Sequence, residues 1–556
     1  MASANGTQAG EPTTVQVQPS EALEESNSPR KGVAFWFIFL SINITLFLSA
    51  MELTAVSTAL PTIAHDLNGT DFVWVGSAYT LSSTAFLPMT GGFSQIFGRK
   101  PAVFLCLALF FIGSAICGAA TNMSMLIAAR AIQGSGGGGL QAVSSIILAD
   151  LVTLRERGFY SAFFSLTWSL ASTIGPVVAG SLVSRGQWRW LFYLNLPIIG
   201  VASVLVLIFL QLPVPQGSFH EKVSRLDWFG NLIIIGSTAA CTIAINWGGV
   251  VAPWGAARVL VPLIVGLVGL CFFMLYESFI AKEPLVPYSL ITNRTSLSGY
   301  LQTFFMGFIT LGLIYFYPVF FQACKGVSAA ESGVIGLSLA VSTVFAVCVG
   351  LSVKITKRYR PQIWVGWSLL VAGLGLLSTL KAHDSIGKGA GYLIFASVGL
   401  GCVYAGGMFP ILAPLPVTSN AHALAFMTFL RSFAGVWGIT VGSTVLQNEL
   451  TSKLPPDFLN RFPQGVQIAY AAIPVIPSLP EPVKTEVQNL FARALSDIWL
   501  VLLGISAAGL LCSLLMKGLP LHGNMDKEFS GNEKEVNNND YSGKIVMKPD
   551  LKADEK

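Results

Sequence analysis

Residues 82–110 read SSTAFLPMTGGFSQIFGRKPAVFLCLALF, a short glycine-rich turn that ends in a basic pair and has apolar residues on both sides. Each side belongs to an apolar run of about 20 residues, which is long enough to cross roughly 30 Å of hydrocarbon as a helix. The stretch therefore predicts two membrane-spanning helices joined by a turn that carries Arg99 and Lys100.

Runs of this kind recur along almost the whole chain of 556 residues, of which 53% are hydrophobic and 11% are charged. Roughly a quarter of the residues are charged in an ordinary soluble domain, so the lipid bilayer is the expected solvent. The hydropathy criterion gives about 14 candidate spans, and the sequence predicts an all-α integral membrane protein. The approximate centres of the spans are Leu46, Ser82, Phe110, Gly136, Ala171, Ala202, Gly236, Leu267, Phe308, Ala340, Leu370, Gly401, Val436 and Ala507.

The basic residues of the loops predict how the chain is oriented, because Lys and Arg concentrate in short cytoplasmic loops. Alternate loops are basic, beginning with the turn at Arg99 and Lys100. With an even number of spans, both termini are then expected in the cytoplasm. The first span follows Arg30 and Lys31 and is expected to act as an uncleaved insertion signal.

The spans are expected to form two bundles of six helices with a helix pair between them. The predicted parts are a disordered tail (1–31), a first bundle (32–212), a linking pair (228–280), a second bundle (296–516) with a long outer loop (448–494), and a disordered tail (517–556). An internal repeat favours two related bundles, because Gly91 and Gly98 in one turn correspond to Gly350 and Lys357 in another at the same spacing. A chance likeness between basic turns is the alternative.

Several classes of protein are disfavoured. The net charge of +5 is spread over short loops and not gathered in a patch, so no nucleic-acid partner is expected. No ATP-binding, HExxH or GxSxG motif is present, so we expect neither an enzyme nor a primary pump. The eight cysteines lack metal-ligand spacing, and we expect neither a metal site nor a cofactor.

The turn from Gly91 to Lys100 resembles the signature loop between the second and third helices of the major facilitator superfamily. The resemblance implies a cytoplasmic gate that contains Gly91, Gln95, Gly98, Arg99 and Lys100. That family usually has Asp where this chain has Gln95. Glutamine forms hydrogen bonds but carries no charge, so the charge network that holds one conformation closed is expected to be weaker or built differently.

Two further motifs lie in the fourth and fifth spans. Arg130 begins a stretch similar to the family pattern RxxQGxG, and a cation inside the membrane is a functional candidate by default. A structural arginine is the alternative. The following run from Gly136 to Gly139 predicts close approach by a neighbouring helix. Gly175, Pro176 and Gly180 are similar to the GPxxGG motif that the family associates with exporters.

Glu52 lies in a stretch that resembles the family motif LDxTIVNVALP, with Glu in place of Asp. It follows Lys31 by about twenty residues, which is roughly 30 Å along a helix, so we expect it in the outer half of the membrane or near its boundary. A carboxyl group near a cation such as Arg130 could alternate between protonated and ionised forms as a cavity opens to each side. A Glu wetted at the outer end of the helix is the alternative.

Taken together, the motifs from about Phe35 to Met516 resemble the fungal, fourteen-span drug:proton antiporter branch. This implies a second-half gate residue at Arg431 and proton-coupled efflux of amphipathic compounds such as a secondary metabolite, toxin, secreted glycolipid or drug. A carrier for basic amino acids or another small polar solute is one alternative, and a transport-dead sensor is another.

The expected partners are the amphipathic cargo, protons and the lipid bilayer, and one copy of the chain is expected to suffice. The plasma membrane is the expected location, with the vacuolar membrane as the alternative. Among the Asn-x-Ser/Thr sequons, Asn68 is the best candidate for glycosylation and Asn122 is the next.

Overall fold

The computed structural model describes residues 31–67, 73–183, 185–212, 214–249, 252–282, 284–455, 458 and 472–521. In this part of the chain the regular structure is helical, apart from one isolated bridge between Gly248 and Ala252. Residues 1–30 and 522–556, which make up most of the two predicted tails, lie outside the described residues, and so does Asn68.

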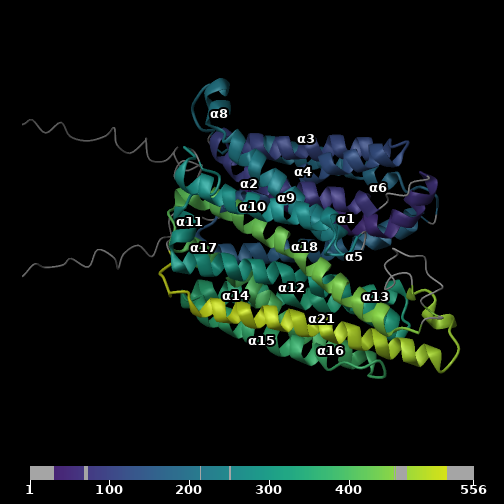
Figure 1. The fold of residues 1–556 in the computed structure, drawn as a ribbon. Helices are drawn as coiled ribbons and strands as arrows, with labels where there is room; N and C mark the ends of the chain where they lie inside the picture. Colours follow the sequence, from purple (N-terminus) through teal and green to yellow (C-terminus); the bar gives the residue numbers. More distant parts are fainter. Residues whose placement is uncertain are drawn as a thin grey trace, which may run out of the picture.

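The first half of the chain forms one group of helices, which lies above the second half in Figure 1. In this group α2 packs against α4, α3 packs against α4, and α1 lies against α5 and α7. The bounds are α1 (Val33–Asp66), α2 (Val73–Phe97), α3 (Arg99–Gly118), α4 (Met123–Leu151), α5 (Leu154–Val183), α6 (Trp190–Tyr193) and α7 (Asn195–Phe209).

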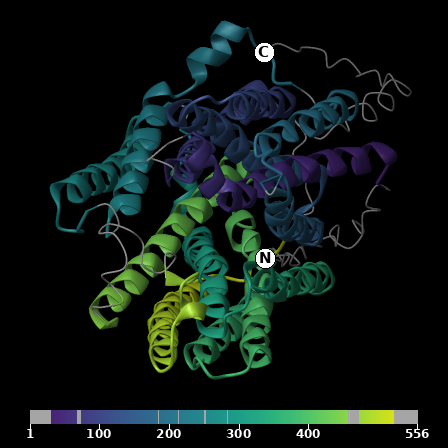
Figure 2. The ribbon, with the colours of Figure 1, turned by 90° about the vertical axis from the view of Figure 1, so that its right-hand side faces the viewer.

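The second half forms a second group, in which α12 packs against α18 and α21, and α15 packs against α16 and α21. Its elements are α11 (Ser289–Thr292), α12 (Arg294–Lys325), α13 (Ala329–Gly336), η1 (Leu337–Ala340), α14 (Val341–Thr356), α15 (Arg360–Ser378), α16 (Ile386–Gly406), α17 (Met408–Leu412), η2 (Val417–Ser419), α18 (Asn420–Lys453), η3 (Ile476–Ser478) and α21 (Val483–Leu514). Seen end-on in Figure 2, the two groups lie side by side.

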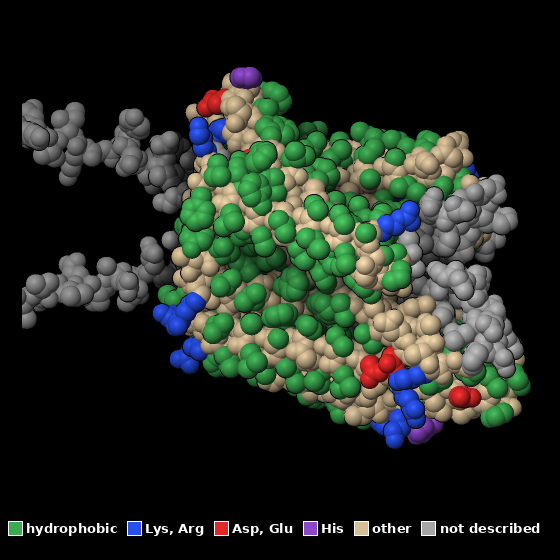
Figure 3. Space-filling model, in the orientation of Figure 1, with side chains coloured by type: hydrophobic (Ala, Val, Ile, Leu, Met, Phe, Trp, Pro, Cys, Tyr) green, Lys and Arg blue, Asp and Glu red, His purple; other side chains and the backbone are tan. Residues whose placement is uncertain are grey.

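Between the two halves the chain forms α8 (Phe219–Arg225), α9 (Trp228–Trp247) and α10 (Ala257–Phe279). α9 packs along α10 and contacts both α2 and α18, so the pair is attached to both groups. α10 turns an apolar face outward, where Val261, Ile264 and Val268 are more than half exposed. Figure 3 shows hydrophobic side chains across the middle of one whole face, with charged side chains toward its two ends, as expected for a surface in contact with lipid.

Twelve helical segments among the described residues are long and apolar enough to cross a membrane, so the chain is a multi-pass membrane protein. The predicted fourteen also include α2 and α4, which have 25 and 29 residues but are not among the twelve apolar segments. Both are rich in Gly, Ser and Thr and lie against other helices of the first group. A helix covered by protein does not have to be lipid-soluble, which explains why these two fail a criterion based on hydropathy.

The outer loop predicted over residues 448–494 is shorter in the structure. α18 continues to Lys453, and α21 begins at Val483. The intervening stretch contains residues 456–457 and 459–471, which lie outside the described residues.

The glycine run of α4 does bring neighbouring helices close, as its sequence predicts. A Cβ atom added at Gly136 would lie 2.6 Å from the backbone nitrogen of Phe110 on α3. A Cβ at Gly138 would lie 2.8 Å from the carbonyl carbon of Ser83 on α2. The absence of side chains here allows α4 to contact α2 and α3 through their backbones.

Replacing Gly136 by Ala is therefore expected to destabilise the protein by about 1–3 kcal/mol, the usual cost of overpacking. Gly76→Ala is the matched control, because a Cβ added at this α2 glycine meets nothing within 4 Å. Thermal unfolding of the purified variants in detergent measures the effect. Equal unfolding temperatures for Gly136→Ala and the wild type would contradict the close packing.

Candidate functional site

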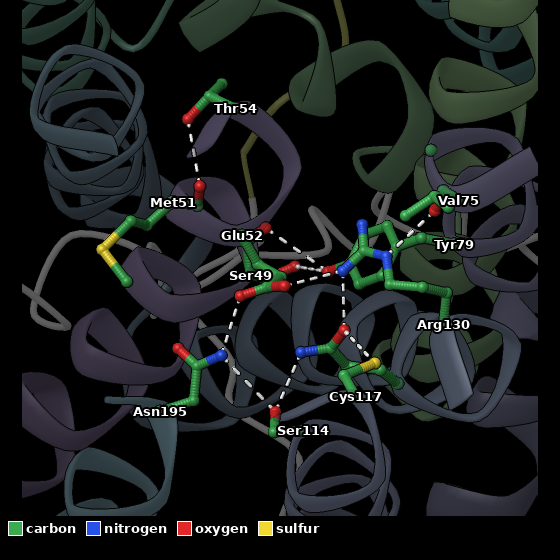
Figure 4. Close-up of polar contacts among 12 residues, drawn as sticks. Ser49, Met51, Glu52, Thr54, Val75, Tyr79, Ser114, Cys117, Arg130 and Asn195 are labelled. Carbon is green, nitrogen blue, oxygen red and sulfur yellow. Dashed lines mark hydrogen bonds and ion pairs between the residues drawn. The ribbon is translucent and has the colours of Figure 1, made fainter. Parts of the chain in front are cut away.

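The centre of the first group holds a buried ion pair between α1 and α4. Arg130 donates from Nη1 to Glu52 Oε1 over 2.7 Å, and both side chains are 1% exposed. The cation that the sequence predicts near Glu52 is thus confirmed, and the alternative of a Glu wetted at the end of its helix is wrong (Figure 4). Each charge stabilises the other in this buried position, because an unpaired charge is costly to bury.

Further hydrogen bonds join Arg130 and Glu52 to two other helices, α2 and α7. Arg130 Nη1 also donates to Gln133 Oε1 over 2.6 Å, and Arg130 Nε donates to the Val75 carbonyl of α2 over 3.0 Å. Asn195 of α7 donates to Glu52 Oε2 over 2.7 Å. The guanidinium also stacks on the ring of Tyr79, 4.4 Å from its centroid. The pair therefore ties α1, α2, α4 and α7 together.

Sequence reasoning did not assign a role to Asn195 or Gln133. Gln133 Nε2 donates to Ser114 Oγ on α3 over 2.8 Å, and this extends the network to a fifth helix. A polar side chain within an apolar run was the signal that could have singled them out. Their partners lie on other helices, so the run itself gives no indication of what they bind.

A cavity of about 210 Å³ lies between the two groups of helices. Ser49, Leu53 and Tyr79 belong to its wall, while Glu52 and Arg130 lie just behind them. The tyrosine is held in this position by contact of its hydroxyl with Ser49 Oγ over 3.2 Å. A change in the ion pair would therefore act directly on the side chains that face the cavity.

Most of the wall is apolar, with scattered hydroxyl groups and one guanidinium. The described lining residues are Ser49, Leu53, Tyr79, Thr80, Ser83, Thr84, Gln141, Ser165, Trp168, Ser169, Met306, Gly307, Thr310, Leu311, Ile314, Leu339, Ser342, Leu400, Tyr404, Arg431, Ser432, Val436 and Ile439. They come from both halves of the chain, and none of them is Asp or Glu. Such a wall suits an amphipathic molecule better than a small polar one.

Arg431, which the resemblance places at a second gate, lies on the wall of this cavity. Its guanidinium stacks on Tyr404, 4.8 Å from the ring centroid. Arg431 also borders a smaller cavity of about 30 Å³. Its role at a gate stays a prediction.

The predicted gate loop contains a charge network, but its carboxylate comes from elsewhere in the chain. Arg99 is 1% exposed and pairs with Asp150, at the end of α4, over 2.8 Å. It also donates to the Ser94 carbonyl over 3.0 Å and to Gln95 Oε1 over 3.4 Å. Gly98 has φ of 95°, a conformation that favours glycine. The network is thus built differently from the family pattern, with Asp150 as the anion.

Gln95 takes part in closing this end of the protein. Its Nε2 donates to the Thr418 carbonyl of the second half over 3.3 Å. A Cβ at Gly91 would lie 2.6 Å from the Cβ of Ala425, so α2 and α18 are in close contact here. Lys100 instead bonds the Leu207 carbonyl within the first half over 2.8 Å.

A second contact between the halves lies at the same end. Glu156 of α5 pairs with Lys354 of α14 over 2.9 Å and with Lys31 over 3.2 Å. Close by, a Cβ at Gly158 would lie 3.2 Å from the Cα of Gly350. The basic end, which the sequence predicts to be cytoplasmic, is therefore closed in this structure.

The exporter-type motif lies in α5 beside the ion pair. A Cβ at Gly175 would lie 3.1 Å from the Met51 carbonyl, so α5 and α1 approach closely next to Glu52. Gly180 has no such neighbour within 4 Å, and Pro176 lies in the same helix. Of the glycosylation candidates, Asn122 caps α4 by accepting a hydrogen bond from the Met125 amide over 2.8 Å, and its modification stays a prediction.

Known proteins resemble this chain over most of its length. It is 35% identical over 540 residues to the "Efflux pump FUS6" of Gibberella fujikuroi, and the aligned region covers 95% of this chain and 97% of that protein. It is 38% identical over 502 residues to the "MFS-type efflux pump MMF1" of Pseudozyma antarctica, covering 88% and 92% of the two chains.

Among solved structures, the human organic anion transporter MFSD10 has a similar fold, with a TM-score of 0.54 at 16% identity over 85% of this chain and 99% of that one. The family model described as Major Facilitator Superfamily matches residues 42–439. The chain belongs to the Major Facilitator Superfamily and is a multi-pass membrane transporter, not an enzyme.

Proposed function

We propose that this transporter exports amphipathic organic molecules in exchange for protons. The observation that carries the proposal is the buried Glu52 and Arg130 pair, which lies directly behind the wall of a cavity shared by both halves. The relatives named as efflux pumps support the direction of transport. The proton gradient is a suitable source of energy, because each charge moved across 100 mV is worth about 2.3 kcal/mol.

The mechanism follows from the contacts of Glu52. A proton that reaches this carboxylate cancels the charge that Arg130 and Asn195 now hold. Arg130 then loses its counterion, and the packing of α1 against α4 and α7 must change to accommodate the cation. Tyr79 carries this change to the cavity wall, because it stacks on Arg130 and faces the cavity. Release of the proton on the other side of the membrane restores the ion pair.

We propose fourteen spans in all, with α2 and α4 added to the twelve apolar segments. Both helices are long enough to cross the bilayer, and their less apolar surfaces are covered by neighbouring helices. The termini then lie in the cytoplasm. The two halves of one chain enclose the cavity, which favours a functional monomer. We retain the plasma membrane as the proposed location.

The cavity wall argues against the rival carrier for basic amino acids. A cationic amino acid needs a carboxylate to bind its side chain, and no described lining residue supplies one. Arg431 would repel such a solute. Nothing in the described residues favours a transport-dead sensor.

Purified protein in vesicles with an imposed pH gradient tests the proposal. We expect gradient-driven transport of at least one of three fluorescent compounds: ethidium, N-phenyl-1-naphthylamine and 8-anilino-1-naphthalenesulfonate. Glu52→Gln keeps the shape of the side chain but cannot exchange a proton, so the gradient should no longer drive transport. Glu449→Gln is the matched control, because this glutamate pairs with Lys453 on the outer part of α18, outside the described cavity wall.

If the gradient still drives transport in the Glu52→Gln variant, the protein is an antiporter whose proton site is not Glu52. If none of the three compounds responds to the gradient in the wild type, proton-coupled export of amphipathic compounds is contradicted.

The coupling between the two charges can be measured separately by stability. Arg130→Gln leaves Glu52 buried without its counterion and is expected to cost about 3–5 kcal/mol at neutral pH. The double variant Glu52→Gln, Arg130→Gln removes both charges and should recover a large part of that loss. Thermal unfolding of the wild type, the two single variants and the double variant checks this. Additive losses in the double variant would show that the charges do not depend on each other.

A further inference from the structure

Two arginines lie along the route between the closed basic end and the central cavity. Arg431 borders the central cavity and the small one, and Arg157 of α5 borders the small one. Tyr404 lines both, so the two spaces are neighbours. The proton mechanism described above uses neither guanidinium.

Arg157 is buried deeply and has unused donors. It is 2% exposed, and its Nη2 donates to the carbonyls of Ala149 and Val152 over 2.8 and 3.4 Å, which caps the end of α4. Its Nε and Nη1 have no hydrogen-bond partner among the described residues. Asp150 interacts with it electrostatically, but this carboxylate bonds directly to Arg99. Buried donors of a cation are costly to leave unpaired, so these N–H groups are suited to bind an acceptor.

Arg431 likewise has a buried donor without a partner, and no carboxylate of the described residues is bonded to it. Its guanidinium stacks on Tyr404, and its Nε is buried without a hydrogen-bond partner. The described lining of the small cavity is again free of Asp and Glu, and consists of Ser145, Leu148, Arg157, Ser161, Phe164, Tyr404, Met408, Leu424, Met427 and Arg431. Both spaces are therefore positively charged and bordered by apolar side chains.

We propose that the cargo is an amphipathic organic anion, with a carboxylate that Arg431 binds and an apolar body that fills the central cavity. This inference rests on the proposed function and adds the class of cargo to it. A guanidinium is suited to this task because its parallel N–H groups match the two oxygens of a carboxylate. The apolar wall, which includes Leu53, Trp168 and Met306, suits the body of such a molecule.

Arg157 provides an earlier binding position for the same carboxylate. The small cavity has room for little more than one water molecule, so the cargo cannot pass through it in this structure. When the halves separate at the basic end, the free N–H groups of Arg157 meet the anion before Arg431 does. The carboxylate of the cargo then accepts hydrogen bonds from Arg157 Nε and Nη1.

Binding to the purified full chain in lipid nanodiscs tests the proposal without any transport. The probe is tritium-labelled 1-naphthaleneacetate, and its neutral isostere 1-naphthaleneacetamide competes with it. We expect the acid to bind about tenfold more tightly than the amide, as a charge-assisted hydrogen bond would give. Arg431→Gln should remove this preference by lowering the affinity for the acid alone, and Arg431→Lys should keep part of the preference. Arg157→Gln should lower the affinity for the acid by a smaller factor.

Arg360→Gln is the matched control. Arg360 also stacks on an aromatic ring, 4.6 Å from the centroid of Trp364, and also has a buried Nε without a hydrogen-bond partner. It lies outside the described lining of both cavities, so its loss should change neither affinity. An unchanged elution profile in size-exclusion chromatography shows that each variant is folded.

Equal affinities for acid and amide in the wild type would overturn the proposal, and so would a failure of both compounds to bind. A parallel loss of both affinities in Arg431→Gln would assign the arginine a structural role. Displacement of the acid by equimolar chloride would assign the site to a small inorganic anion, which overturns it as well. None of these results affects gradient-driven transport of a neutral compound, so the proposed function can stand when this inference fails.

Discussion

An ion pair inside a membrane protein is the constraint around which the first half of this transporter is arranged. Glu52 and Arg130 lie in a region where neither charge is tolerable alone, and they are held by groups from α1, α2, α4 and α7. Because each helix contributes a partner, none of them can move without changing the environment of the charges. In the proposed mechanism, protonation of the Glu52 carboxyl group therefore changes the helix packing.

The other features of the structure surround this ion pair or connect it to the cavity. Glycines bring α4 against α2 and α3, and Gly175 brings α5 against α1, so the ion pair lies among closely packed backbones. Tyr79 joins the pair to the cavity. At the basic end, Gln95 and Glu156 contact the second half and close the cavity on that side. These features fit the proposed exchange by alternating access, which requires a proton site, a space for the cargo and a gate.

Much of this could be predicted from the sequence. Apolar runs predict spans because the length of a helix that crosses hydrocarbon is fixed, and the pairing of Glu52 with Arg130 follows from the cost of isolated charges in a membrane. Other features depend on contacts between residues that are distant in the chain. Asp150 and Asn195 are polar residues in largely apolar segments, but only the fold shows that they bind Arg99 and Glu52. Apolar runs do predict α2 and α4, but only the fold shows which helices pack against them.

The central claim is that Glu52 takes up and releases a proton. Infrared difference spectroscopy of the purified protein, recorded between neutral and acidic pH, tests it most directly by comparing the wild type with Glu52→Gln. The account predicts that acidification produces the band of a protonated carboxyl group in the wild type, and that this contribution is absent from the variant. Identical difference spectra for the two proteins would contradict the account, because Glu52 would then keep one protonation state throughout.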